Sequence, residues 1–359
     1  MRVLHVITSL KIGGAEKLMV DLLPRLKSKN IECELLTFDG TRTPFRQDLE
    51  NAGVVVHDFG QGVSPYSLRN IVKLMPYLRK YDIVHTHNTA CQLFAAIGSV
   101  LCSVVLCTTE HTTSNRRRGW RWYAPIDRWM YSRYKKVICI SQIAENNLCT
   151  YIGKDCKNIL TVNNGVNINR YFKAPISTEL ESIAPNSRKL IMVAGFRWEK
   201  DQDTIIKALR YLPSHFHLFL VGDGVRRFEL ESLAKEENVN QRVHFLGIRN
   251  DVPNLLHAAD YIIMSSHFEG LSLSSVEGMS IGKPFIASDV DGLREVTSGA
   301  GLLFPHQDSE ALAKQIEKLE KSPHLYNSTA ALCLERAQQF DISKMVEGYL
   351  NVYLEISKQ

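Results

Sequence analysis

Short β-branched runs alternate with helical patterns along the whole chain, and this alternation constrains the fold most strongly. It is typical of parallel sheets whose strands are joined by crossover helices. Seven runs in the first half are predicted as strands: 3–8, 32–38, 54–57, 83–87, 104–109, 136–141 and 159–163. After a weakly periodic loop at 175–187, six more follow: 189–195, 217–221, 243–246, 261–264, 284–287 and 301–304. The predicted fold class is therefore α/β, with two Rossmann-like, doubly wound domains facing across a cleft.

The length of 359 residues agrees with this duplication, because single hydrophobic cores stop growing near about 250–300 residues. We expect one Rossmann-like domain over 1–172 and a second over 188–340. The segment 341–359 is predicted as a C-terminal helix that caps either of the two domains, and crossing back to the first domain is one of these two alternatives. Ligands of doubly wound folds bind at the carboxyl ends of the strands, so the cleft is the expected site.

Charge is divided unevenly between the two halves. Residues 1–170 carry 23 Lys and Arg against 13 Asp and Glu, a balance of +10, whereas residues 171–359 have a balance of −5. The first half is therefore expected to face an anionic partner. The eight cysteines contain no C-x-x-C pair, which predicts reduced thiols in a cytoplasmic protein rather than a disulfide framework or a zinc site. We expect neither a cleaved signal peptide nor a membrane span.

The strongest chemical signal lies at 267–288, where Glu269 and Glu277 stand eight residues apart around a predicted helix start. Gly270 permits close backbone approach, and a helix that begins near Leu271 offers unpaired N–H groups to an anion such as a diphosphate. A sugar nucleotide has hydroxyls at both ends and phosphates between them, which fits two carboxylates beside such a seat. Helix capping and first-turn charge are the alternative interpretation of both carboxylates.

Two further groups of residues are suited to phosphate. Arg197 and Lys200 lie in a turn after the predicted strand 189–195, and cations stabilise the negative charge that develops on a departing diphosphate. Gly13 and Gly14 precede the first helix and can present backbone N–H groups to a phosphate. The alternatives are a solvated turn for the two cations and a tight strand-to-helix connection for the glycines.

These residues, with others in the same order, resemble retaining glycosyltransferase family 4, which has the GT-B fold and includes bacterial capsule and lipopolysaccharide enzymes. The resemblance covers nearly the whole chain. Its motifs are IGGAE at 12–16, DIVHTH at 82–87, NNGVN at 163–167, GDG at 222–224, VHFLG at 243–247, Glu269 with Glu277, and SDVDGLRE at 288–295.

In this family, the residue matching Glu277 binds the ribose of the donor, and the residue matching Glu269 contacts hydroxyls of the donor sugar. The resemblance also implies that backbone N–H groups around Leu273 and Ser274 hold the diphosphate. Lys200 matches the lysine of the family. The arginine of the family falls on Gly195, so Arg197, two residues later, is the candidate replacement.

His111 follows the predicted strand 104–109 and resembles the histidine that lies beside the donor sugar in the family. The catalytic candidates are therefore His111, Glu269, Arg197 and Lys200. Backbone contacts near Gly247 and Ile248 are expected to select the base. For His85 and His87, packing or lining the acceptor pocket is favoured over metal binding, because no carboxylate or cysteine partner is identifiable. We predict no metal and no cofactor; the nucleotide diphosphate sugar is a substrate.

The segment from Arg116 to Lys136 contains eight cations, one acid and six Trp or Tyr residues. This mixture favours an anionic membrane surface and a lipid-linked glycan acceptor at the inner face of the cytoplasmic membrane. An amphipathic helix whose aromatic side chains pack inward is the alternative. Stacking on nucleic acid is not expected, because no nucleic-acid motif accompanies the segment.

The resemblance implies a retaining glycosyltransferase that moves a hexose-type unit from a nucleotide diphosphate sugar to a hydroxyl acceptor in surface polysaccharide synthesis. Two alternatives remain open. One is a sugar-nucleotide 2-epimerase of the same fold, which would need neither an acceptor nor the basic, aromatic segment. The other is a binding module that has lost activity, which the departure at Gly195 permits.

Overall fold

The computed structural model describes every residue except 12, 113–115, 121, 154–155, 271 and 359. For residues 116 and 117 it describes the backbone and not the side chains. The chain forms two compact units. The first contains Met1–Asn164 and Ile342–Gln359, and the second contains Gly165–Asp341. Residues 165–172, predicted as the end of the first domain, lie in the second unit.

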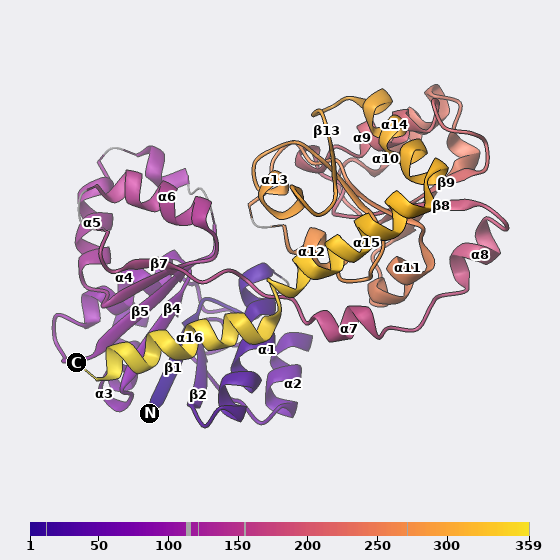
Figure 1. The fold of residues 1–359 in the computed structure, drawn as a ribbon. Helices are drawn as coiled ribbons and strands as arrows, with labels where there is room; N and C mark the ends of the chain where they lie inside the picture. The colour runs from indigo at the N-terminus through magenta and orange to yellow at the C-terminus, as the bar shows by residue number, and fades with distance from the viewer. Residues whose placement is uncertain (12, 113–115, 121, 154–155, 271, 359) are drawn as a thin grey trace. The chain divides into compact units, whose positions relative to one another are not determined.

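The described part of the first unit contains a seven-stranded, fully parallel sheet with the order β3-β2-β1-β4-β5-β6-β7 (Figure 1). The central pair β1 and β4 sets His5 opposite His85. The strands are β1 (Arg2–Ile7), β2 (Glu32–Thr37), β3 (Val55–Asp58), β4 (Ile83–His87), β5 (Val105–Glu110), β6 (Lys136–Cys139) and β7 (Ile159–Thr161).

Helices cover both faces of this sheet. One hydrophobic cluster packs α1 and α16 on one face of the sheet. A second cluster packs the helices α3, α4, α5 and α6 on the other face. Side-chain caps start two of these helices, because Thr43 accepts from Arg46 N and Ser141 accepts from Ala144 N. The helices are α1 (Gly14–Ser28), α2 (Pro44–Asn51), α3 (Arg69–Lys80), α4 (Thr89–Gly98), α5 (Ala124–Ser132), α6 (Gln142–Ile152) and α16 (Ile342–Ser357), with a 3₁₀ turn at Arg116–Gly119.

The described part of the second unit contains a six-stranded parallel sheet with the order β10-β9-β8-β11-β12-β13. The strands are β8 (Arg188–Val193), β9 (Phe216–Val221), β10 (Val243–Gly247), β11 (Tyr261–Met264), β12 (Phe285–Ser288) and β13 (Leu302–Phe304). Helix α9 contacts α10 and α14, and α12 contacts α13 and α15. The helices are α7 (Ile168–Phe172), α8 (Glu179–Ile183), α9 (Gln202–Ala208), α10 (Arg227–Glu236), α11 (Val252–Ala258), α12 (Leu273–Met279), α13 (Leu293–Thr297), α14 (Ser309–Lys321) and α15 (Pro323–Gln338), with 3₁₀ turns at Trp198–Lys200 and Asn240–Arg242.

Each strand predicted from the sequence is present, with ends that differ by at most two residues. The central strands are apolar because helices cover both faces, as parallel sheets require. β4 and β11 are buried along their entire length. Among the buried polar side chains of these strands are three histidines of the first sheet, His5, His85 and His87, all fully buried. Among the described residues, no helix is both long and apolar enough to cross a bilayer.

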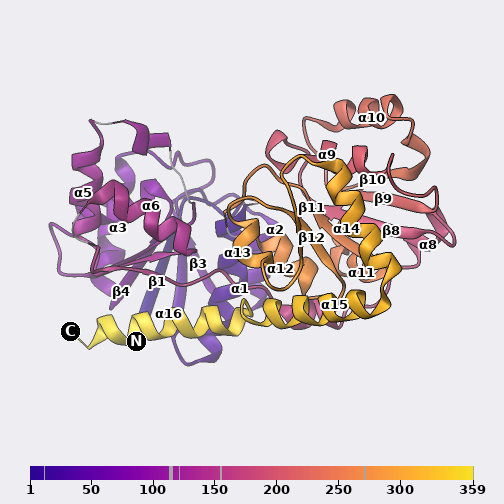
Figure 2. The ribbon, with the colours of Figure 1, turned by 45° about the horizontal axis from the view of Figure 1, so that its top comes forward.

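Helix α16 is the part of the first unit that comes from the end of the sequence. It lies along α1 (Figure 2) and buries seven side chains against the first unit, including Tyr349 and Tyr353. Close packing is possible because of Gly348: a Cβ on this residue would lie 2.7 Å from Cγ1 of Val162. The helix is thus fitted to the sheet at a defined position.

We therefore expect Gly348→Val to destabilise the first unit by roughly 1–3 kcal/mol, the usual cost of overpacking a tight contact. The midpoint urea concentration at which the first unit unfolds should decrease. Glu347→Ala, at the exposed neighbouring position, should leave this midpoint unchanged. Equal midpoints for Gly348→Val and the parent protein would show that α16 does not pack closely on Val162.

Candidate functional site

Most of the predicted site residues follow the carboxyl ends of strands, because successive parallel strands expose their loops at the same edge of a sheet. In the second unit, Arg197 and Lys200 follow β8 and Glu269 follows β11. Gly247 ends β10, and Ile248 comes directly after it with 81% of its surface exposed. In the first unit, His111 follows β5. Each unit therefore gathers its own set of candidates.

Lys200 and Glu269 form a direct ion pair in the second unit. Nζ of Lys200 donates to Oε1 of Glu269 at 2.5 Å, and Oγ of Ser266 donates to the same oxygen at 2.8 Å. The two charged side chains are 27% and 11% exposed, respectively, so the pair is shielded from water more than a surface salt bridge is. The cation and the carboxylate hold each other in place, and Ser266, which the sequence analysis did not identify, orients the carboxylate.

A glycine fixes the loop that carries Glu269. Gly292 has φ 83°, and a Cβ on it would lie 2.1 Å from the carbonyl oxygen of Gly270 and 2.3 Å from that of Glu269. Only glycine fits a backbone approach of this kind. The close approach predicted at Gly270 beside a diphosphate stays a prediction; what the structure adds is that Gly292 packs against the carbonyl of Gly270. Glu269 N also donates to the carbonyl of Asp291 at 3.2 Å.

Arg197 lies beside the position where the family has its arginine. Gly195 has no side chain, and Nε and Nη2 of Arg197 lie 3.6 Å and 3.8 Å from the place that a Cβ of residue 195 would take. The exposed Arg197 side chain thus turns back along the loop toward Gly195. Its guanidinium lies within van der Waals contact of the place where the side chain of residue 195 would begin.

The other donor-site candidates lie on α12 and at the end of β10. Leu273 and Ser274 are the first two residues of α12, and Glu277 is half-buried one turn further along. The first N–H groups of a helix have no partner within it. The expected helix start at Leu271 lies outside the described residues. Gly247 has φ 68°, and its carbonyl accepts from Gly222 N at 2.8 Å, which ties the loops after β9 and β10 together.

In the first unit, Gly13 and Gly14 begin α1, and the side chain of Glu16 folds back over them. A Cβ on Gly13 would lie 2.3 Å from Oε2 of Glu16. The carboxylate thus occupies the place near the helix N-terminus where a phosphate was expected, which is typical of a capping residue at the third helical position. Burial raises the pKa of the Glu16 carboxyl, although a hydrogen bond to Asn88 opposes this shift.

His111 is the outer end of a chain of buried polar groups. Its Nε2 lies 2.9 Å from Nδ1 of His87, and Nε2 of His87 lies 3.0 Å from Nδ1 of His5. Burial lowers the pKa of His111 to about 4 and that of His5 to about 3. It also lowers the pKa of His85 and His87 well below the ordinary value. All four imidazoles are therefore neutral near pH 7.

Two groups of side chains in the described part of the chain are close enough to share a cation: His5 with His85 and His87, and Asp201 with His267 and His306. In the second group, Nδ1 of His267 and Nε2 of His306 lie 2.7 Å apart. Oδ2 of Asp201 accepts from Thr204 at 2.7 Å as part of the α9 cap. These atoms are already paired within the protein, and the absence of a metal stays a prediction.

The segment 116–136 has two sides. Trp120, Trp122, Ile126 and Trp129 are exposed, and the first two rings stack with centroids 5.8 Å apart. The inward side consists of Asp127, Met130, Tyr131 and Tyr134, all buried. The inward-packing interpretation therefore holds for these tyrosines and fails for the tryptophans. Arg121 and the side chains of Arg116 and Arg117 lie outside the described residues.

Comparison with known proteins assigns the chain to a family. A model of Glycosyltransferase Family 4 matches residues 12–170, and a model of glycosyl transferases group 1 matches residues 178–336. Together the two models match most of the chain, and the protein belongs to this family of glycosyltransferases.

The relatives of this chain are consistent with this family assignment. The N-acetyl-alpha-D-glucosaminyl L-malate synthase of Bacillus anthracis is 29% identical over 375 residues, which cover 96% of this chain and 94% of the relative. The UDP-Gal:alpha-D-GlcNAc-diphosphoundecaprenol alpha-1,3-galactosyltransferase of Escherichia coli is 23% identical over 309 residues, 80% of each chain. The structure of Anabaena HepE in complex with UDP matches with a TM-score of 0.85 and 22% identity, covering 99% of this chain and 100% of HepE. The predicted α/β class with two Rossmann-like domains and the predicted family are thus confirmed.

The buried histidines predict a marked acid sensitivity. Their pKa values are lower in the folded state than the ordinary value near 6.5, so the unfolded chain binds more protons as the pH falls below about 6.5. Between pH 7 and 5, the free energy of unfolding should fall by up to about 1.4 kcal/mol per pH unit for each buried histidine.

Urea unfolding of the first unit at pH 7, 6 and 5 checks this expectation. Most carboxylates remain ionised in this window, so the slope reports the histidines. His87→Phe removes one of these histidines. It should reduce the slope of the unfolding free energy against pH by the contribution of about one proton. A free energy of unfolding that does not change between pH 7 and 5 would contradict neutral burial of these side chains.

Proposed function

We propose that this protein is a retaining glycosyltransferase that moves a sugar from a nucleotide diphosphate sugar to a hydroxyl of a lipid-linked glycan in surface polysaccharide synthesis. The observation that carries the proposal is the Lys200–Glu269 ion pair, 2.5 Å long, whose carboxylate comes from the loop that precedes α12. A cation for a diphosphate and a carboxylate for sugar hydroxyls are thus held together by one contact. The family membership and the printed activities of the relatives support the same reaction.

The proposed reaction breaks the bond between the anomeric carbon and the diphosphate oxygen, and forms a bond from that carbon to the acceptor oxygen. The acceptor proton passes to the departing phosphate on the same face of the sugar, which retains the anomeric configuration. Lys200 and Arg197 stabilise the charge on the leaving diphosphate. Glu269 accepts hydrogen bonds from sugar hydroxyls through Oε2, since only Oε1 is engaged among the described residues.

The remaining candidates bind and orient the donor in this proposal. Glu277 accepts from the ribose hydroxyls, and the first N–H groups of α12, at Leu273 and Ser274, hold the diphosphate. The backbone at Gly247 and Ile248 contacts the base. Gly13 and Gly14 can reach a phosphate only if the Glu16 carboxylate moves away from the start of α1. With Lys200 and Arg197 providing the positive charge, we propose that no metal ion is needed.

The donor site is tested first by calorimetry with UDP, GDP, ADP and their glucose conjugates. One nucleotide should bind selectively, and Glu277→Ala should abolish the binding. Lys200→Ala and Glu269→Ala should each lower transfer by about 100-fold or more, whereas Lys235→Ala, an exposed change on α10, should not.

EDTA should leave transfer unchanged if the charge is carried by the side chains. Formation of a 2-epimer from the donor without an acceptor would favour the epimerase alternative, and binding without turnover would favour a binding module. If no nucleotide binds, the proposed donor site is wrong.

The exposed side chains of the segment 116–136 support the proposal that the acceptor is lipid-linked. Trp120, Trp122 and Trp129 are 52%, 68% and 41% exposed, and Trp side chains favour the headgroup layer of a membrane. Arg128 and Lys135 are exposed in the same segment, where each adds up to about 1 kcal/mol of attraction to an anionic surface. A lipid-linked acceptor would be found at such a surface, and this supports the proposed substrate class.

Vesicle sedimentation tests the membrane contact. The protein should bind vesicles that contain phosphatidylglycerol and not pure phosphatidylcholine. The double variant Trp120→Ser, Trp122→Ser should lower the partition coefficient by roughly tenfold or more, because two exposed aromatic anchors are lost. Trp198→Ser removes a tryptophan of similar exposure from the second unit and serves as the matched control. Equal partitioning of the double variant and the parent would exclude this segment as the membrane anchor.

A further inference from the structure

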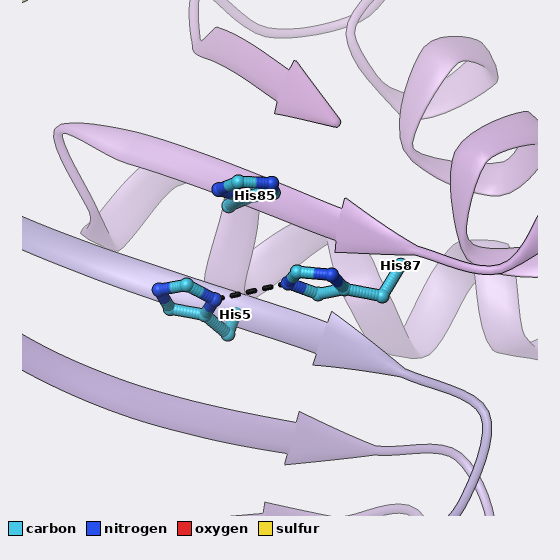
Figure 3. Close-up of side chains that lie close together, drawn as sticks. All are labelled: His5, His85 and His87. Atoms are coloured by element: carbon cyan, nitrogen blue, oxygen red, sulfur yellow. Dashed lines mark hydrogen bonds between the residues drawn. The ribbon is translucent and has the colours of Figure 1, made fainter. Parts of the chain in front are cut away.

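Seven buried or half-buried side chains of the first unit form one continuous line of hydrogen bonds, which we name the histidine chain. Beyond His111, His87 and His5, the line continues from Nε2 of His5 to the Tyr353 hydroxyl at 3.2 Å, and from that hydroxyl to Nδ1 of His85 at 2.6 Å. Figure 3 shows His5 and His87 joined across neighbouring strands, with His85 beside them. The far end runs from Nε2 of His85 to Thr109 at 2.8 Å and from Thr109 to the Tyr349 hydroxyl at 3.1 Å.

The grouping of His5, His85 and His87 suggests a metal site, but the contacts argue against one. All six ring nitrogens already have a hydrogen-bond partner in the histidine chain. The three rings also stack, with interplanar angles of 9°, 11° and 19°, so their in-plane lone pairs do not converge on one point. A cation would have to break the chain in order to bind.

The direction of the hydrogen bonds follows from counting donors. A neutral imidazole has one N–H donor and one acceptor nitrogen, and the Tyr353 hydroxyl has one hydrogen for its two histidine partners. Four arrangements satisfy every link, because a hydroxyl can also accept from both of its neighbours, and they differ in which hydrogen is left outside the chain. In three of them it is a hydroxyl hydrogen, of Tyr349, Thr109 or Tyr353, and these fully buried groups have no acceptor outside the chain among the described residues. An unpaired buried donor is costly, so the fourth arrangement is favoured, in which donation runs from Tyr349 toward His111.

In this direction, each of the four histidines accepts at Nε2 and carries its hydrogen on Nδ1. The last of them is His111, whose Nδ1 has no hydrogen-bond partner among the described residues. A ring fixed in this way offers a donor of defined position just beyond the carboxyl end of β5. It is suited to an oxygen of a bound ligand and not to carrying a proton.

We propose that the histidine chain fixes His111 as a neutral Nδ1–H donor to an oxygen of the donor sugar, with His87, His5 and Tyr353 as positioning residues. The proposal rests on the proposed function, since His111 affects turnover only if a sugar binds beside it. Because Tyr353 belongs to α16, the helix from the end of the sequence takes part in setting a ring at the site. The contribution of α16 to transfer is thus more than covering the sheet.

The tautomers are measured directly by nitrogen-15 NMR of histidine-labelled protein, since protonated and unprotonated ring nitrogens give well-separated resonances. His5, His85, His87 and His111 should each show a protonated Nδ1 and an unprotonated Nε2, with no titration between pH 5 and 8. Protonation of His111 at Nε2 would overturn the proposal. This measurement needs no substrate, so it remains decisive even if no nucleotide sugar binds and the proposed function fails.

The positioning role is tested with two substitutions of one residue. His87→Phe keeps a buried ring but removes the donor to His111, whereas His87→Asn is smaller but has an amide N–H near the place of Nδ1. If the hydrogen bond matters, His87→Asn should keep near-parental kcat for the glucose conjugate that binds in calorimetry, and His87→Phe should lose about tenfold, the effect of one orienting hydrogen bond.

Packing alone would give the opposite order, because phenylalanine fills the apolar site better than asparagine. A kcat for His87→Phe equal to or above that of His87→Asn therefore overturns the proposal. His244→Phe is the matched control. His244 pairs with His217 at 3.0 Å in the second unit, with rings stacked in the same manner, and lies outside the histidine chain. Its substitution should leave kcat unchanged.

Discussion

Parallel pairing of the backbone is the constraint on which the rest of the molecule depends. Parallel neighbours cannot be joined by tight hairpins, so each strand must be followed by a crossover that returns the chain to the opposite end of the sheet. Helices then cover both faces, the strands become apolar, and the segments that remain free to bind ligands are the loops at the carboxyl edge. Lys200, Glu269 and His111 all come from such loops. Their chemistry is varied, but their placement is determined by the hydrogen-bonded ladder behind them.

The first sheet departs from the apolar rule at its centre. β1 and β4 carry His5, His85 and His87, all fully buried, and burial without partners would cost several kcal/mol for each polar ring. The cost is avoided because each ring nitrogen is paired, and a paired network in a medium of low dielectric is also rigid. In the second unit, polar groups are held by an ion pair instead. Lys200 and Glu269 neutralise each other, and Gly292 fixes the loop that carries Glu269. Both units thus hold polar groups in place through contacts made before any ligand arrives.

The sequence alone was sufficient for the strands, their order of appearance and the family, because these depend on local periodicity and on short motifs. It was not sufficient for contacts between distant segments. Tyr353 lies 348 residues from His5, and no local pattern connects them; the available signal was that histidines occur inside strands predicted to be buried. The sequence predicts Glu16 as a dipole-stabilising residue of the first helical turn, but it does not predict that the carboxylate folds back over Gly13, since a Gly-Gly turn looks the same whether a phosphate or a neighbouring side chain occupies it. That Lys200 and Glu269 follow strand ends could be read from the sequence, but their direct pairing could not, because it joins residues 69 apart in the chain.

The return of α16 to the first unit has a consequence for how the protein is made. Residues 1–164 reach the end of the ribosome long before residues 342–357 have been synthesised, and the whole second unit is translated in between. Until then, one apolar face of the first sheet lacks the side chains of α16, and the hydroxyl that joins His5 to His85 is missing. Domains that are complete in sequence fold as they emerge, so the second unit, although later in the chain, is the first that can finish folding. The nascent first unit must keep its exposed face from aggregating for the duration of that synthesis. Its yield of folded protein therefore depends on the rate of translation and on chaperone binding to this face.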